Sequence, residues 1–453
     1  MTEPPSNRRS RREFLAASAF AASALTVQPD LLRRLSRTDD RPMLTLALRA
    51  ARWIEKSTHR EGAGLRWPAD PRRPESVDFD FYNGMPGVVL FFALLHDATG
   101  DPHWLELARG GGDSLIAALD GGTLDAGLYI GLAGIGYTLD TLAAVGAKGP
   151  YREGADRAWR EIVRRQNLAG LWGESYDIIS GGAGTALGLL AAAKTRRDPT
   201  LVAAATRAGA ALLAAGETDH GGLMWFPAGN FRRNYPNFSH GTAGVGYTLA
   251  TLHQVTGEDR FLQGALAAAR YLDGVATRAN GTAKIFHQSG GGEERFYLSW
   301  CHGPVGTSRL FYRLHQITRE KQWADWVDSL AGAVFASGIP EQRTPGFWSN
   351  ISQCCGNVGV GQFCIDLARY RPSAGLAAFQ QRVVTDTMRR ATDDSNGLRW
   401  IQAENRTQPD NLMAQTGFMQ GAAGVGTFLL QADALARNQS WGLSQPDTPF
   451  HRG

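Results

Sequence analysis

The stretch Gly241-Thr-Ala-Gly244-Val-Gly-Tyr-Thr-Leu-Ala-Thr-Leu252 decides the fold of this 453-residue chain, because its pattern occurs seven times. Each copy is a Gly-x-x-Gly pair at the head of a run of apolar and small residues. The pairs are Gly84/Gly87, Gly131/Gly134, Gly181/Gly184, Gly241/Gly244, Gly303/Gly306, Gly356/Gly359 and Gly421/Gly424. Successive first glycines lie 47, 50, 60, 62, 53 and 65 residues apart, so the pattern covers nearly the whole chain. Such internal self-similarity predicts a repeat architecture.

The repeated unit is predicted to be a pair of helices. The run after each Gly-x-x-Gly, such as Val88–Leu95, is apolar on most faces, which is typical of a helix buried all round. An amphipathic stretch precedes each pair, with apolar residues at helical spacing against charged ones. These stretches are Leu44–Lys56, Trp104–Leu119, Arg152–Gln166, Leu201–Ala215, Arg260–Ala276, Gln322–Ser337 and Leu376–Ala391. We therefore expect seven inner and seven outer helices in alternation.

We predict that these hairpins close into an all-α toroid, an α/α barrel of seven helical hairpin repeats. An open array needs polar caps at its ends, whereas the uniformly apolar inner helices favour a closed ring. The Gly-x-x-Gly loops would then meet at one mouth, where glycine permits positive φ angles and close backbone approach. We place the toroid at residues 44–437, after an N-terminal linker at 25–43 and before a C-terminal tail at 438–453.

Composition agrees with one large core and gives little support to nucleic-acid binding. Apolar residues make up 43% of the chain, which is enough to bury a large core. The formal net charge of +4 is modest for this length, and no arginine stripe is interleaved with aromatic residues. We expect no nucleic-acid partner.

The N-terminus resembles a twin-arginine export signal over residues 1–24. Arg8 and Arg9 precede Ser10-Arg-Arg-Glu-Phe-Leu15, and a mild apolar run continues to the small-residue exit at Ala22-Ser-Ala24. This run is too short to span a membrane as a stable helix. We expect export to the periplasm or the outside of the cell, with no transmembrane segment in the mature form. A disordered basic tail on a cytoplasmic protein is the alternative.

Three of the four cysteines gather at the Gly-x-x-Gly mouth. Cys301 lies in a Trp-Cys-His-Gly segment, and Cys354 and Cys355 lie in Gln-Cys-Cys-Gly, whereas Cys364 lies in an apolar run and is expected to be a core thiol. Four thiols in a chain this long do not make a disulfide framework, and an adjacent pair would be strained. Three thiolates plus one exchangeable water are typical of a catalytic zinc site. We therefore predict Zn²⁺ bound by Cys301, Cys354 and Cys355.

Taken together, these segments resemble the LanC family of lanthionine cyclases over roughly residues 40–435. The resemblance rests on the seven glycine pairs, the two cysteine segments, Tyr176-Asp177 and Ser239-His240-Gly241. It implies an α,α-toroid with zinc at its centre. It also implies addition of a peptide cysteine thiol to dehydroalanine or dehydrobutyrine, which closes a lanthionine-type thioether ring. By position, the three cysteines match the family's zinc ligands, His240 its acid/base histidine and Asp177 its supporting carboxylate.

Residue chemistry agrees with these roles. A free thiol has a pKa of about 8.5, whereas a zinc-bound thiol ionises near neutral pH. The thiolate would attack the β-carbon, and the resulting enolate must be protonated at its α-carbon. A histidine with an unperturbed pKa near 6.5 can supply that proton, and a carboxylate such as Asp177 can hold its imidazole. His240 is distinguished from the other histidines by its place one residue before Gly241.

The chain departs from the commonest family pattern at two positions. Cys355 stands where stand-alone cyclases usually have histidine, which makes the zinc site net negative and the substrate sulfur more nucleophilic. Tyr297 stands where many members have arginine, so the family's enolate-stabilising role is open here, and Arg295 is a candidate substitute. His302 is an additional candidate donor. Tyr176 is a further candidate substrate contact.

Signal and toroid together account for all of the chain, so we expect no dehydratase or kinase domain within it. A separate dehydratase would supply the dehydrated precursor peptide. Two alternatives stay open. A non-catalytic zinc- or peptide-binding relative would keep the metal without turnover, although the presence of His240 and Asp177 argues mildly against it.

The second alternative is a carbohydrate-active hydrolase, because α/α toroids also host glycosidases. Such an enzyme needs two carboxylates across the mouth. The candidate acids are Asp78, Asp80, Glu174 and Asp177, and the candidate sugar-stacking tryptophans are Trp172, Trp225, Trp300 and Trp348. This alternative leaves the three clustered cysteines unexplained.

Overall fold

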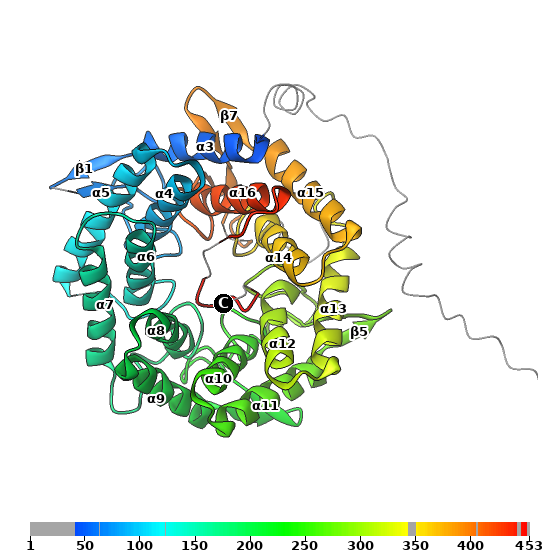
Figure 1. The fold of residues 1–453 in the computed structure, drawn as a ribbon. Coiled ribbons are helices and arrows are strands. Elements are labelled where there is room, and N and C mark those ends of the chain that lie inside the picture. The colour runs from blue at the N-terminus through cyan, green and yellow to red at the C-terminus, as the bar shows by residue number, and fades with distance from the viewer. Residues whose placement is uncertain are drawn as a thin grey trace, which may run out of the picture.

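The computed structural model describes residues 41–62, 64–122, 124–342, 350–404, 406–441 and 445–450, so the proposed export signal lies outside the described residues. In the described part, fourteen α-helices alternate between an inner and an outer layer of a closed ring (Figure 1). The inner helices are α4 (Met85–Thr99), α6 (Leu132–Ala144), α8 (Gly182–Arg196), α10 (Thr242–Thr256), α12 (Pro304–Thr318), α14 (Asn357–Tyr370) and α16 (Ala422–Ala436). The outer helices are α3 (Pro42–Glu55), α5 (Pro102–Ala118), α7 (Tyr151–Arg165), α9 (Pro199–Ala215), α11 (Asp259–Val275), α13 (Lys321–Phe335) and α15 (Ala374–Arg389). The predicted all-α toroid is confirmed.

The two layers follow from the burial patterns of their helices. Helix α4 buries every residue from Met85 to Leu95, because its sides meet neighbouring inner helices as well as the outer layer. Helix α7 buries Tyr151, Ala155 and Trp159 along one stripe and leaves charged residues outside. Within the part of the chain that the structure describes, no helix has the length and apolar character needed to cross a membrane.

The two ends of the helical chain close the ring. Each outer helix packs most closely on the inner helix that precedes it, as α5 does on α4. The first outer helix, α3, packs instead on α16, the last inner helix. Arg41, which precedes α3, pairs with the buried Asp433 of α16 at 2.7 Å between Nη2 and Oδ2. The hairpin unit is therefore an inner helix and the outer helix that follows it, which reverses the order predicted from the sequence.

The Gly-x-x-Gly glycines are required for close backbone contact. None of the first glycines, which cap the inner helices, has a positive φ angle, so that part of the sequence prediction is wrong. A Cβ atom at Gly241 would lie 1.4 Å from the carbonyl oxygen of Tyr235. A Cβ atom at Gly306 would lie 1.9 Å from that of Trp300. Each loop thus folds back directly onto the helix that it starts.

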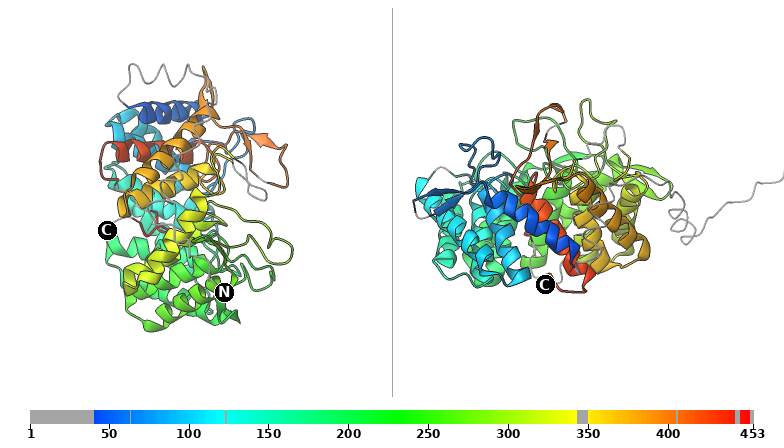
Figure 2. Two further views of the ribbon diagram at one scale, coloured as in Figure 1. Left: turned by 90° about the vertical axis from the view of Figure 1, so that its right-hand side faces the viewer. Right: turned by 90° about the horizontal axis from the view of Figure 1, so that it is seen from above.

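Short antiparallel β-hairpins lie on one face of the ring (Figure 2). Four of them follow outer helices and pack on an outer helix of the next unit. They are β1 (His59–Glu61) with β2 (Gly64–Arg66), β3 (Glu217–Asp219) with β4 (Gly222–Met224), β5 (Thr277–Ala279) with β6 (Thr282–Lys284), and β7 (Thr392–Asp394) with β8 (Gly397–Arg399). A fifth pairs β9 (Gln402–Ala403) with β10 (Leu412–Met413).

Candidate metal centre and active site

A closed circle of backbone hydrogen bonds joins the seven Gly-x-x-Gly loops, and we call it the loop ring. In six of the loops, one residue makes both bonds, and it stands two positions before the first glycine. Its amide donates to a carbonyl of one neighbouring loop, and its carbonyl accepts from an amide of the other. The donors, in chain order, are Tyr82, Tyr129, Ile178, Ser239, Cys301, Cys354 and Met419, over distances of 2.8 to 3.1 Å. In the third loop, Ile178 donates and the adjacent Ile179 accepts. Equivalent repeat positions therefore become neighbours around the centre of the toroid.

The loop ring brings the three predicted cysteine ligands together. Cys301 and Cys354 are consecutive members, joined by a bond of 3.1 Å from the amide of Cys301 to the carbonyl of Cys354. The Sγ atom of Cys355 lies 3.2 Å from that of Cys301 and 3.3 Å from that of Cys354. All three sulfurs lie within 4.8 Å of one another, and none is in a disulfide. Cys364 lies fully buried in α14, as predicted for a core thiol.

The chemistry of this cluster fits a divalent cation. Burial raises the pKa of Cys354, but hydrogen bonds from Cys301, Cys355 and Tyr82 lower it well below its usual value. The pKa of Cys355 lies well above the usual value because its two thiol neighbours and burial disfavour a further negative charge. Ionisation of all three thiols at this spacing would require a compensating positive charge, and Zn²⁺ is commonly held by such sulfur ligands.

A tyrosine from the opposite end of the chain supports the cluster. The hydroxyl of Tyr82 donates to Cys354 Sγ at 2.9 Å and accepts from Gln420 Nε2 at 3.0 Å. Its ring position is equivalent to that of Cys354, two residues before its own Gly-x-x-Gly. Sequence reasoning missed this residue, although alignment of the seven repeats contains the signal.

His240 and Asp177 form a directed pair beside the cysteines. His240 Nδ1 lies 2.6 Å from Asp177 Oδ2, while Asp177 Oδ1 accepts from the amides of Ser180 at 2.8 Å and Gly181 at 2.9 Å. Burial lowers the pKa of His240, but Asp177 outweighs it and the pKa lies above its usual value. Burial raises the pKa of Asp177, but the hydrogen bond and the charge of His240 outweigh burial, so this pKa lies below its usual value. The imidazole is thus held in one orientation and kept readily protonated.

The other four predicted site residues differ in the contacts that they make. His302 is buried and its ring lies 5.6 Å from that of His240 between centroids, while its Nδ1 has no hydrogen-bond partner among the described residues. Tyr297 accepts a hydrogen bond at 2.8 Å from Arg406 Nε. By contrast, Arg295 pairs with the adjacent Glu294 at 3.2 Å. The hydroxyl of Tyr176 lies 3.1 Å from where a Cβ at Gly229 would stand.

Two residues near the cluster were not predicted. The ring of His287 lies 4.4 Å from that of His302 and 4.5 Å from that of Tyr297 between centroids. Burial, with the positive charges of Arg406 and Arg295, lowers the pKa of His287 to about 4, so this imidazole is neutral at pH 7. Arg406 comes from the connection between β9 and β10, which lies outside the repeat pattern.

The side chains considered for a hydrolase are largely engaged elsewhere. Asp177 is bound to His240, and Asp80 accepts from the amides of Asn83 and Gly84 in its own turn. Glu174 accepts from Asn230 at 2.7 Å. The indoles of Trp172, Trp225 and Trp300 each donate to a group of the protein itself, and Trp348 lies outside the described residues. These contacts favour the cysteine cluster as the chemical centre.

Comparisons with known proteins agree on family and fold. The model of the family "Lanthionine synthetase C-like protein" matches residues 75–441. Among solved structures, nisin cyclase matches with a TM-score of 0.60 at 17% identity, covering 87% of this chain and 94% of that chain. The Lin0763 protein from Listeria innocua matches with a TM-score of 0.52 at 12% identity, covering 88% and 99%. At these identities the similarity concerns the fold alone. No curated protein sequence matches the chain.

Proposed function

We propose that this chain, which belongs to the lanthionine synthetase C-like family, is a zinc-dependent cyclase that forms thioether rings in a dehydrated precursor peptide. The reaction adds a cysteine thiol to dehydroalanine or dehydrobutyrine. The observation that carries the proposal is the convergence of three cysteine sulfurs with the His240–Asp177 pair on consecutive parts of the loop ring.

Cys301, Cys354 and Cys355 would hold the zinc ion. When bound, zinc would lower the pKa of the substrate thiol, whose proton passes to the solvent, from which His240 is later reprotonated. The hydrogen bond from Tyr82 stabilises negative charge on Cys354 Sγ and fixes the direction of that ligand.

His240 would complete the addition. The sulfur electron pair forms the carbon–sulfur bond at the β-carbon, and the electrons of the carbon–carbon double bond move into an enolate. Protonated His240 then delivers its proton to the α-carbon, which restores the carbonyl and leaves a neutral imidazole. Asp177 holds the imidazole through Nδ1, which leaves Nε2 to face the substrate.

The surroundings of the reaction are further parts of the proposal. A separate dehydratase would supply the substrate. The N-terminal segment would direct the folded, metal-loaded protein through the twin-arginine route. Arg406 and Tyr297 lie beside His287 and are placed to contact the peptide near the cluster.

The proposal is tested by metal content and thiol addition on the same preparations. We expect about one zinc per chain in the wild type and in the matched control Cys364→Ala, and strongly reduced zinc in single alanine variants of Cys301, Cys354 and Cys355. The wild type should also add a peptide thiol to a dehydroalanine peptide, with His240→Ala retaining zinc but losing turnover. A metal-free wild type would overturn the mechanism. Zinc binding without any thiol addition would favour a non-catalytic binding protein.

A further inference from the structure

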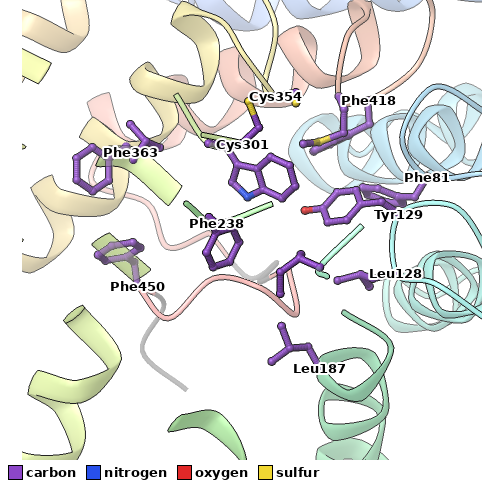
Figure 3. Close-up of a cluster of buried hydrophobic side chains, with 14 of the residues drawn as sticks. Phe81, Leu128, Tyr129, Leu187, Phe238, Cys301, Cys354, Phe363, Phe418 and Phe450 are labelled. Carbon is purple, nitrogen blue, oxygen red and sulfur yellow. The ribbon is translucent and has the colours of Figure 1, made fainter. Parts of the chain in front are cut away.

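A segment near the end of the chain lies inside the toroid. In Figure 1 the red chain after α16 passes through the middle of the ring, and Figure 2 shows it toward the face opposite the hairpins. The carbonyl of Pro449 accepts from Gln316 Nε2 at 3.2 Å, and Phe450 packs its ring 4.6 Å from that of Tyr312 between centroids. In Figure 3, Phe450 belongs to the same buried cluster as Phe238 and Cys301.

Asp447 is the central residue of this segment and is completely buried. Its Oδ2 atom accepts hydrogen bonds from Trp300 Nε1 at 2.9 Å and from the Tyr129 hydroxyl at 3.1 Å. Its backbone carbonyl accepts from Arg309 Nε of α12 at 3.1 Å. The carboxylate therefore joins two Gly-x-x-Gly loops that are not neighbours along the chain.

Both side chains that bind this carboxylate are tied to the loop ring. Tyr129 is itself a member of the loop ring. Trp300 directly precedes Cys301, which is one of the two members of the loop ring that contribute a sulfur to the cluster. The rings of Tyr129 and Trp300 lie 5.0 Å apart between centroids. Asp447 thus supports the loop of Cys301 from inside the ring, toward the face opposite the hairpins.

The choice of a carboxylate at this position needs a physical reason. Burying an acidic group is costly unless its hydrogen bonds are made. Both side-chain donors to Oδ2 are neutral, and Oδ1 has no hydrogen-bond partner among the described residues. An apolar residue could occupy this buried position without that cost. A carboxylate is favoured where the orientation of its two donors matters, because it restrains both at once.

We propose that Asp447 is a positioning residue of the metal centre, which acts through Trp300 to hold Cys301 in the geometry that the cation requires. This inference depends on one part of the proposed function, namely that the cysteine cluster is the metal site. It adds a contribution of the segment 445–450 to that site, from the face of the ring opposite the hairpins.

The test uses the full-length protein and measures zinc affinity and the absorption of the cobalt(II)-substituted form, whose thiolate-to-metal bands report sulfur geometry. We expect Asp447→Ala to weaken zinc binding by up to about tenfold, the lower end of the loss when a direct partner of a metal ligand is removed, because Asp447 acts one residue further out, and to alter the cobalt bands. Asp447→Asn keeps the shape and one acceptor, so it should show a smaller change in the same direction and remain folded. The matched control Gln316→Ala loosens the segment away from Trp300 and should leave the spectrum unchanged.

A double variant tests the route of the effect. If Asp447 acts through the indole, adding Asp447→Ala to Trp300→Phe should cause little further loss of zinc affinity. Wild-type affinity and bands in both Asp447 variants would show that the segment only packs inside the ring, and would overturn the inference while leaving the proposed function intact. A wild type that binds no metal would overturn both, and the two failures are distinguished by the wild-type measurement alone.

Discussion

Replacement of Asp177 by asparagine isolates the control that this carboxylate has over His240. In the wild type, Oδ2 of Asp177 faces His240 Nδ1 at 2.6 Å, while Oδ1 accepts from the amides of Ser180 and Gly181. These two amides require an acceptor, so the oxygen of the asparagine side chain must remain with them. The amide nitrogen of the new side chain then faces Nδ1 as a donor. The protonated imidazole, which also carries a proton on Nδ1, loses its acceptor.

The size of the effect follows from the charged hydrogen bond that is lost. Such bonds contribute about 1.5–3 kcal/mol, which corresponds to roughly 10- to 150-fold in rate if His240 must be protonated to act. The direction in which the pH profile of the rate moves can also be stated. Burial lowers the pKa of His240 and Asp177 raises it above the usual value, so its removal lowers the pKa. The acid form is then lost at a lower pH, and the basic limb of the rate profile moves toward acid.

The assay is the pH dependence of single-turnover thiol addition to a dehydroalanine peptide, with zinc content measured on each sample. Asp177→Asn should keep its zinc, react about 10- to 150-fold more slowly at pH 7, and approach the wild-type rate as the pH falls. The matched control Ser180→Ala removes a hydroxyl that bonds Asp177 at 3.1 Å and Ser175 at 3.0 Å, leaves the carboxylate facing His240, and should shift the profile little. A variant with the wild-type basic limb would refute the role of His240 as the acid. A rate loss explained by missing zinc would refute the assignment of Asp177 to the proton step.

Three further changes test other parts of the site and fold. Cys355→His should retain zinc but slow thiol addition, because a neutral ligand replaces a thiolate; an unchanged or faster rate at full zinc content would contradict this. Tyr82→Phe removes the hydroxyl that donates to Cys354 and should weaken zinc binding about tenfold in a chelator competition, and unchanged affinity would count against its role. Gly306→Ala places a Cβ 1.9 Å from a carbonyl oxygen and should lower the free energy of unfolding by about 3 kcal/mol or more in denaturant, whereas Gly173→Ala, with no atom within 4 Å, should change it by less than about 0.5 kcal/mol. Equal stability of these two variants would refute the close-contact explanation of the glycines.

The ring architecture could be predicted from the sequence because its determinants are local and repeated. The glycine pairs mark where each loop must touch its own helix, and the apolar runs mark the helices that are buried all round. The clustering of Cys301 with Cys354 and Cys355 could also be predicted, because equal repeat positions meet around the centre. Arg406 could not, because it lies in an irregular connection between β9 and β10 whose course the repeat pattern does not determine.

The buried segment near the C-terminus left a weaker sequence signal that the prediction of a tail at 438–453 did not use. Arg309 stands in the middle of α12, an inner helix whose other residues up to Tyr312 are apolar or small. A buried guanidinium requires acceptors, which its own helix supplies only in part, through the carbonyl of Val305. A second acceptor is the carbonyl of Asp447. The partner of such a residue is set by long-range packing, so its presence could be predicted from the sequence but its identity could not.

The loop ring explains how one reactive centre arises from a nearly regular scaffold. Because each ring member bonds the next loop along the chain, sequence order is preserved as order in space. The loops of Asp177, His240, Cys301 and Cys354 are the third to the sixth, so the proposed proton donor and the proposed sulfur ligands occupy one continuous arc. The first two loops contribute Tyr82 and Tyr129. The Tyr82 hydroxyl donates to Cys354, and the Tyr129 hydroxyl donates to Asp447. Specialisation of a few side chains at equivalent backbone positions is therefore sufficient to build the site, provided that the ring stays closed by the packing of α3 on α16.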